Sequence, residues 1–272
     1  MQAEFLNETL HQPRTRQRVR GLRRISLRSV APYVTLLLVL GLWQLVVSLE
    51  LYPTFIIPPP LAVLEKFREV LVDGRLWLHA STTLTQTLAG LGFGVTTGVA
   101  LGYLIAKNRT LEALLSPIIV AFQATPVVAY APLLILWFGS GMTSKVITSA
   151  LIVFFPMLMN TVVGVRTVPA PLRELMRSLR ATPWQMFTRL EVPAALPVLL
   201  SGLKVSATLA VIGAVVGEFV SANAGLGFLI NVARSQFDTA LVFVVMITLA
   251  AIARALYGVV GLIERRALAW HT

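Results

Sequence analysis

The amino-acid sequence predicts an all-α membrane protein with six transmembrane helices and a cytoplasmic helix–turn–helix insert. Of its 272 residues, 56% are hydrophobic and 13% are charged. A water-soluble domain of that composition would expose large apolar patches, so the chain is expected to reside in a lipid bilayer. The hydrophobic residues gather in six segments long enough to cross it. A polar, arginine-rich stretch interrupts this series and predicts the insert.

Residues 1–29 are polar and basic, and we expect them to form a cytoplasmic arm. The arm is longer than the charged region of a cleavable signal peptide, so no such peptide is predicted. The first transmembrane helix follows at 30–50. The segment 51–80 is expected outside the membrane, where the run PPPLAVLEKFREVLVDG predicts a short amphipathic helix.

The transmembrane core, residues 78–263, contains five further apolar segments, and a cytoplasmic tail follows at 264–272. The predicted helices are 82–106, 111–138, 143–163, 194–220 and 239–262. Of the 23 lysines and arginines, sixteen fall in segments that this topology places in the cytoplasm and five in segments that it places on the external side; Lys204 and Arg254 fall within spans. By the positive-inside rule, both termini are therefore cytoplasmic.

Four glycines recur at every fourth position of the second predicted span: Gly90, Gly94, Gly98 and Gly102. This spacing puts all four on one helix face, where the absence of side chains lets another helix approach closely. We interpret this face as packing within the chain rather than as a contact between subunits.

The third predicted span is long and holds three prolines, so we expect a break near its middle. Gln123 and Thr125 lie just before Pro126 at membrane depth. Irregular backbone is tolerated there only inside the protein or beside a water-filled cavity. These residues are candidates for a solute path, with a satisfied polar patch between helices as the alternative. Two separate spans would make the total odd, but the charge distribution favours six.

Among the ionisable residues of the predicted spans we single out three: Lys204, Glu218 and Arg254. An unpaired charge at bilayer depth is costly and therefore suggests a function. We expect Lys204 to extend toward the cytoplasmic surface, and Glu218 to lie too far out to pair with either cation. For Arg254 three arrangements stay open: it pairs with backbone carbonyls at a helix end, it extends toward the cytoplasmic surface, or it faces the solute path. Glu218 and Arg254 thus join the path candidates.

The polar stretch at 170–193, which we call the coupling insert, carries its own helix signals. Pro171 suits the first turn of one helix, and Thr182 with Gln185 predicts a capping box at the start of a second. Pro193 is expected to end the second helix. The alternative is an ordinary amphipathic loop that lies on lipid headgroups.

The coupling insert resembles the signature loop of ABC-importer permeases. Glu174, Ala181 and Pro193 match that pattern, whereas Arg180 replaces the glycine that usually supplies a left-handed turn residue. The resemblance implies contact with an ATPase through Glu174, Leu175, Leu179, Arg180, Ala181, Thr182, Phe187 and Pro193.

Three further runs narrow the resemblance to one branch of these permeases: FIIPPPLAVL at 55–64, PLLILWFGSG at 132–141 and GLG at 225–227. The branch serves nitrate, sulfonate, taurine and vitamin-like heterocycles, and the likeness covers roughly residues 45–268. It implies a type I transmembrane subunit in the cell membrane, among lipids, with a second permease copy, two cytoplasmic ATPase subunits and an extracellular solute-binding protein. Whether the two permease copies are identical stays open.

The solute is the least determined point. Gly202-Leu203-Lys204 and the run TLAVIGAVVGEF at 208–219 are more similar to permeases for riboflavin or thiamine-type pyrimidines than to those for sulfonates, taurine or nitrate. We therefore favour a vitamin-type heterocycle, with the anions as the alternative.

Other classes of function find less support in the sequence. A secondary transporter that works without an ATPase should show broken helices in both halves. An intramembrane enzyme needs a nucleophile–base pair or a metal set, and the chain has no cysteine and three scattered histidines. It also lacks a P-loop, so no catalytic residue, metal or cofactor is predicted and ATP hydrolysis is expected on a partner. The net charge of +11 follows from topology and does not indicate nucleic-acid binding.

Overall fold

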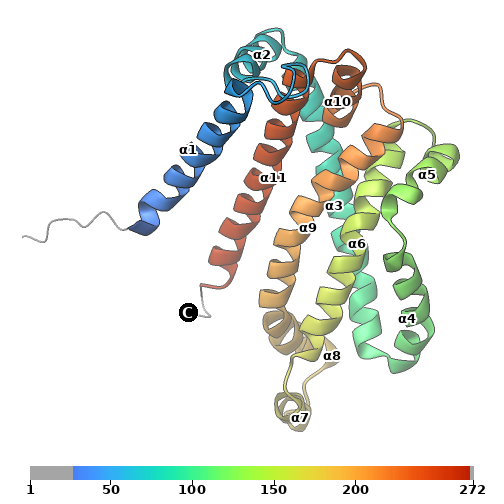
Figure 1. Ribbon diagram of the computed structural model, residues 1–272. Helices are drawn as coiled ribbons and strands as arrows, with labels where there is room; N and C mark the ends of the chain where they lie inside the picture. Colours follow the sequence, from blue (N-terminus) through green and yellow to red (C-terminus); the bar gives the residue numbers. More distant parts are fainter. Residues whose placement is uncertain (1–26, 270–272) are drawn as a thin grey trace, which may run out of the picture.

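The computed structural model describes residues 27–269, and these are almost entirely helical (Figure 1). Most of the predicted basic arm, residues 1–26, and the end of the predicted tail, residues 270–272, lie outside the described residues. The elements in chain order are α1 (Leu27–Ser48), α2 (Pro60–Val72), α3 (Arg75–Lys107), α4 (Arg109–Ala124), a 3-10 turn η1 (Val127–Ala129), α5 (Ala131–Phe138), α6 (Met142–Arg166), α7 (Ala170–Ser178), α8 (Pro183–Met186), a π-helical turn η2 (Phe187–Glu191), α9 (Val192–Val220), α10 (Leu226–Ser235) and α11 (Thr239–Ala267).

Helix α6 lies at the centre of the bundle, between α3 and α9, and glycines line both contacts. A Cβ atom added to Gly90, Gly94, Gly98 or Gly102 of α3 would come within 2.4–2.8 Å of an atom of α6. On the opposite side, Gly213 of α9 would meet the Cα of Ser149 at 2.5 Å. The two backbones therefore approach α6 more closely than any side chain would allow.

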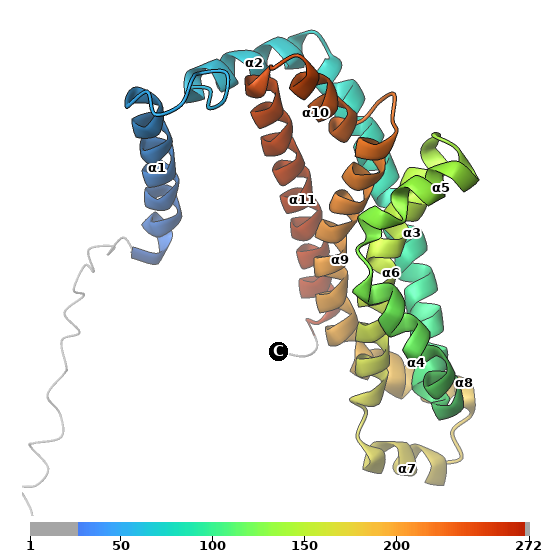
Figure 2. The same ribbon diagram turned by 45° about the vertical axis from the view of Figure 1, so that its right-hand side comes forward.

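The ends of the bundle opposite the coupling insert are covered by α2 and α10. A buried apolar cluster joins these helices to α3 and α11, with Val70, Leu226, Val244 and Val245 among its fully buried members. Helix α1 stands apart from the bundle (Figure 2). Its Trp43 stacks on Phe243 at 5.1 Å and donates a hydrogen bond of 3.1 Å to the carbonyl of Pro58.

By length and composition, four helices among the described residues can cross a membrane, or five if the bent pair of α4 and η1–α5 is one span. Helix α1 has 22 residues and a strongly apolar sequence. Together, α1, the bent pair and these four helices correspond to the six predicted segments. The predicted break in the third span lies after Ala124, where the chain bends by 83°.

Two predicted boundaries differ from the structure. Helix α3 begins at Arg75 rather than near Thr82, because it extends beyond the apolar core to pack against α2 and α10. Pro193 was expected to end a helix, and this expectation was wrong, because the chain stays helical from Pro183 to Val220. The π-helical turn η2 shifts the pairing so that the amide of Val192 bonds the carbonyl of Phe187, and Pro193 then falls in the first turn of α9, where its missing amide is tolerated.

Candidate functional site

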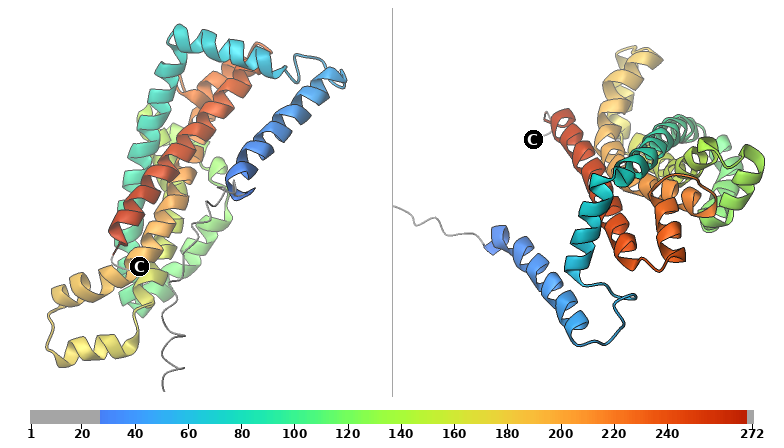
Figure 3. Two further views of the ribbon diagram at one scale, coloured as in Figure 1. Left: turned by 90° about the vertical axis from the view of Figure 1, so that its left-hand side faces the viewer. Right: turned by 90° about the horizontal axis from the view of Figure 1, so that it is seen from above.

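The coupling insert projects from the end of the bundle as the short helix α7, a tight turn, and the first turns of the helical segment that continues into α9 (Figure 3). Arg180 adopts a left-handed conformation with φ of +54°. The amide of Ala181 bonds the carbonyl of Met176 at 3.0 Å, and the amide of Arg180 bonds that of Arg177 at 2.9 Å. These two bonds form a Schellman motif, so Arg180 takes the conformation that glycine usually supplies.

The start of α8 shows the capping box that the sequence predicts. The hydroxyl of Thr182 accepts a hydrogen bond from the amide of Gln185 at 3.2 Å, and the side-chain oxygen of Gln185 accepts one from the amide of Thr182 at 2.9 Å. Because both bonds are local, the turn between α7 and α8 is stabilised from within the coupling insert.

Glu191 anchors the second arm of the coupling insert to α3. Its side chain is 2% exposed, and it accepts hydrogen bonds from the hydroxyl of Tyr103 at 2.9 Å and from the ammonium of Lys107 at 2.6 Å. The first arm is anchored to α6, because Arg173 donates to the carbonyl of Val165 at 2.7 Å. The sequence analysis missed Glu191, which the chain buries through contacts with α3, far away in sequence.

The outer face of the coupling insert is apolar and unusually exposed. The exposed fractions are 54% for Leu175 and 68% for Leu179. Glu174 lies beside them and is also exposed. Phe187, which the resemblance implied as a contact residue, instead turns inward and meets the ring of Tyr103 edge-on at 5.1 Å.

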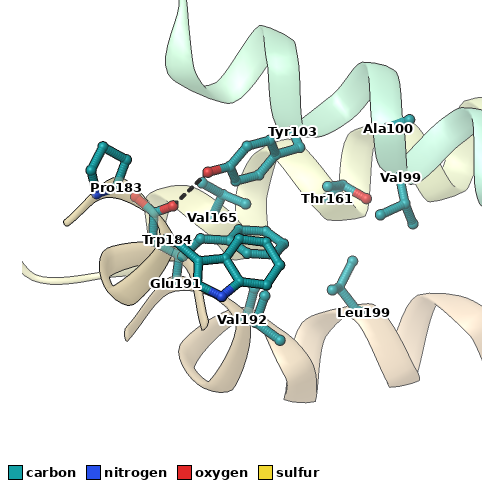
Figure 4. A pocket seen from close by; sticks show the side chains of 12 residues that line it. Val99, Ala100, Tyr103, Thr161, Val165, Pro183, Trp184, Glu191, Val192 and Leu199 are labelled. Carbon is teal, nitrogen blue, oxygen red and sulfur yellow. Dashed lines mark hydrogen bonds between the residues drawn. The ribbon is translucent and has the colours of Figure 1, made fainter. Parts of the chain in front are cut away.

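A cavity of about 590 Å³ lies behind the coupling insert, between α3, α6 and the start of α9. Figure 4 shows Tyr103, Trp184 and Glu191 at one end of it and Val99 and Leu199 at the other. Its lining is almost wholly apolar apart from the Tyr103–Glu191 pair. The residues that attach both arms, Tyr103, Glu191 and Val165, therefore border this cavity.

The structure does not gather the predicted path residues into one site. Gln123 and Pro126 are exposed at the bend between α4 and η1, and the hydroxyl of Thr125 bonds the carbonyl of Ala121 at 3.1 Å. Arg254 is exposed on α11, with its guanidinium 6.0 Å from the ring of Tyr257. Glu218 belongs to a third place, at the opposite end of the bundle from the coupling insert.

Glu218 is fully buried and links α9 to α3 and α10. It accepts hydrogen bonds from the hydroxyl of Thr83 at 2.8 Å and from the amide of Gly227 at 2.6 Å. Thr83 in turn accepts from the amide of Leu226 at 2.7 Å, and His79 accepts from that of Gly225 at 3.0 Å. A buried carboxylate with these partners is structurally satisfied.

Lys204 was expected to extend toward the cytoplasmic surface, and the structure gives it a partner in that direction: it forms an ion pair with Glu264, near the end of α11. The sequence analysis compared the cation only with residues inside the predicted spans, and Glu264 lies beyond the predicted end of the sixth span at 262. Helix α11 continues to Ala267 and carries the partner to the depth of Lys204.

Comparison with known proteins gives consistent matches. The model of the family described as "Binding-protein-dependent transport system inner membrane component" matches residues 94–268. The chain is 46% identical to the riboflavin transport system permease protein of Chloroflexus aurantiacus, over 98% of this chain and 99% of that protein. It is 32% identical to the formylaminopyrimidine transport permease protein of Halalkalibacterium halodurans, over 90% of this chain and 98% of that protein. It is also 32% identical to the taurine transport system permease protein of Escherichia coli, over 98% of each.

Solved structures share the fold. A chain from the inward-facing MetNI methionine ABC transporter aligns with a TM-score of 0.62, covering 72% of this chain and 96% of that one at 21% identity. A chain from an amino acid ABC transporter aligns with a TM-score of 0.56 over 75% of this chain and 96% of that one, at 19% identity.

Proposed function

Because the chain belongs to the family of inner membrane components of binding-protein-dependent transport systems, and is thus the permease subunit of an ABC importer, we propose that it carries riboflavin or a closely related heterocycle across the cell membrane. One observation carries the choice of solute. The riboflavin permease of Chloroflexus aurantiacus is 46% identical along essentially its whole length, whereas the taurine permease of Escherichia coli is 32% identical.

The coupling insert is the proposed docking site for the ATPase. Leu175 and Leu179 expose apolar surface on the first arm of the insert, and such a surface needs a partner in water. Glu174 lies on the same arm and would select a basic region on that partner. Two ATPase subunits, one for each of two permease copies, complete the proposed assembly, with both termini in the cytoplasm and the solute-binding protein on the outer side.

An anionic solute is the second candidate. The chain is 32% identical to the taurine permease of Escherichia coli over 98% of both chains, and 32% identical to a sulfonate permease of Bacillus subtilis over 86% of this chain. The other alternative, a secondary transporter that works without an ATPase, does not fit the family.

Transport in cells that can neither make nor import flavins tests the proposal. The chain is expressed together with its ATPase and binding protein, and uptake of labelled riboflavin and of labelled taurine is measured. We expect uptake of riboflavin that stops when the ATPase carries an inactivating substitution. Uptake of taurine without riboflavin would contradict the proposed solute, and uptake that persists with the inactive ATPase would contradict the mechanism.

A further inference from the structure

A small polar cavity of about 250 Å³ lies at the outer end of the bundle, where α3, the start of α6 and the loop after α9 meet. Its volume is several times the ~30 Å³ that one water molecule occupies in the liquid. Five of its nine lining residues are polar: Thr82, Gln86, Ser140, Lys145 and Asn223. The other two principal cavities of the described residues are lined mainly by apolar side chains.

Lys145 brings a buried positive charge to this cavity. The residue is only 2% exposed, and its ammonium donates to the carbonyl of Ser140. Among the residues that the structure describes, no carboxylate forms an ion pair with it; Glu218, whose oxygens accept from Thr83 and Gly227, acts on it through space. An ammonium has three donors, so two remain. A buried cation without a counter-ion is costly unless something anionic completes it.

The backbone around Lys145 adds to the positive character of the cavity. Gly141 caps α6 and offers no side chain to its first amides, and the first turn contains no acidic residue. Gly141 and Met142 line the cavity, so the amino-terminal end of a 25-residue helix faces it. The unpaired amides and the helix dipole both favour an anion at this place.

Two further groups make the cavity a built site. Gln86 is only 4% exposed, and it serves an anion only through its side-chain NH2 group, because its buried side-chain oxygen, which has no partner among the described residues, is an acceptor. The loop that forms the opposite wall is held in place, because the amides of Gly225 and Leu226 bond His79 and Thr83 of α3. A site of this kind is fixed before its ligand arrives.

We propose that this cavity binds a small oxyanion group, a carboxylate or a sulfonate, that enters from the external side. The group accepts hydrogen bonds from the ammonium of Lys145 and from the first amides of α6, and Asn223 lies at the exposed mouth. The group comes from an acidic side chain of the solute-binding protein if the solute is a neutral flavin, or from the solute if that is a sulfonate. The external location and the two sources of the group rest on the proposed function, whereas the anion-binding cavity itself does not.

Charge-selective labelling tests the site without transport. The native chain has no cysteine, so Asn223→Cys provides one reactive thiol at the mouth. In the full-length protein in lipid nanodiscs, we expect the anionic reagent sulfonatoethyl methanethiosulfonate to react about tenfold faster than the cationic trimethylammonium reagent, relative to their rates with a free thiol. Lys145→Gln should abolish this preference, whereas Arg234→Gln, which removes an exposed external cation, should keep it.

Competition separates the two sources of the oxyanion. Acetate or methanesulfonate, added at constant ionic strength against chloride, should slow labelling, and this arm needs no substitution at Lys145. Protection by the solute-binding protein without solute assigns the group to that protein, and protection by a sulfonate solute alone assigns it to the solute. Equal rates with both reagents, unchanged by acetate, methanesulfonate or binding protein, would overturn the inference while leaving the proposed transport function intact.

Discussion

Arg180 holds a left-handed backbone conformation that costs most residues about 1–2 kcal/mol. The two hydrogen bonds of the Schellman motif fix it there, so the strain is built into the turn of the coupling insert. Arg180→Gly removes the strain, and we expect the thermal midpoint of the purified protein to rise or stay unchanged. Arg180→Val should lower it, because a branched side chain tolerates this conformation least. A lower midpoint for the glycine variant would contradict the left-handed turn.

Glu191 is the anchor between the coupling insert and α3, and its removal should uncouple the two. Glu191→Ala leaves the hydroxyl of Tyr103 and the ammonium of Lys107 without their acceptor, a loss of about 1.5–3 kcal/mol at this contact. We expect normal assembly with the ATPase but ATP hydrolysis that no longer responds to the solute-binding protein. Arg189→Ala, on the exposed side of the same π-helical turn, is the matched control. An unchanged response in Glu191→Ala would show that the anchor does not transmit motion.

Sequence patterns predict local features of single residues well and buried charges poorly. The capping box of Thr182 depends on residues three apart, so the spacing alone predicts it. Glu191 and Lys145 are polar residues that resemble any others near a helix end. The burial of Glu191 depends on α3, whose contacting residues lie 84 or more positions away, and Lys145 packs against Gly217 of α9. No local pattern contains that information, and the same holds for the pairing of Lys204 with Glu264.

At the scale of elements, the glycine face of α3 sets the distance to α6. A Cβ at Gly98 would lie 2.8 Å from the backbone carbonyl of Phe154, whereas one at Gly92 would meet nothing within 4 Å. We expect Gly98→Ala to destabilise the bundle by about 1–3 kcal/mol and Gly92→Ala to leave it unchanged. The fraction of protein that stays monodisperse after heating in detergent measures this. Equal loss in both variants would contradict the packing role of Gly98, because the higher helix propensity of alanine favours both variants.

The bend between α4 and α5 is the second element that a variant can examine. Pro126 follows the last turn of α4, and the chain changes direction by 83° there. Pro126→Ala restores an amide donor, so we expect lower turnover at near-normal expression. Single cysteines at positions 123 and 125 report whether the bend faces water. Reaction no faster than that of a lipid-facing control cysteine, in any nucleotide state, would remove these positions from the solute path.

The order of elements was more predictable than their junctions. Hydropathy and the prolines of the third span predict the apolar segments and the break, because both depend on local composition. The junction at Pro193 was wrong, since a proline normally ends a helix and only the π-helical turn before it removes that requirement. The outward extension of α3 was missed because contacts with α2 and α10, and not the hydropathy of its first turns, fix where the helix begins.

At the scale of the whole molecule, the coupling insert projects beyond one end of the bundle (Figure 3). Glu174→Arg reverses an exposed charge beside Leu175 and Leu179, and we expect normal membrane insertion with at least about a tenfold loss of ATPase association, since like charges across an interface cost several kcal/mol. Co-purification of the ATPase measures it. Glu65→Arg, an exposed acidic residue of α2 at the other end of the molecule, is the control. Full co-purification of the Glu174 variant would place the docking surface elsewhere.

The two anchors of the coupling insert end on two different helices, and those helices are themselves joined by glycines without intervening side chains. The insert is therefore attached at two points, to α6 through Arg173 and to α3 through Glu191. These two points cannot move apart, because α3 and α6 are in close contact from Gly90 to Gly102. A force on the tip of the insert would thus tilt α3 and α6 together as one rigid body. The conformational change that this tilt requires would occur where such close contact is missing, above all at the bend after Ala124.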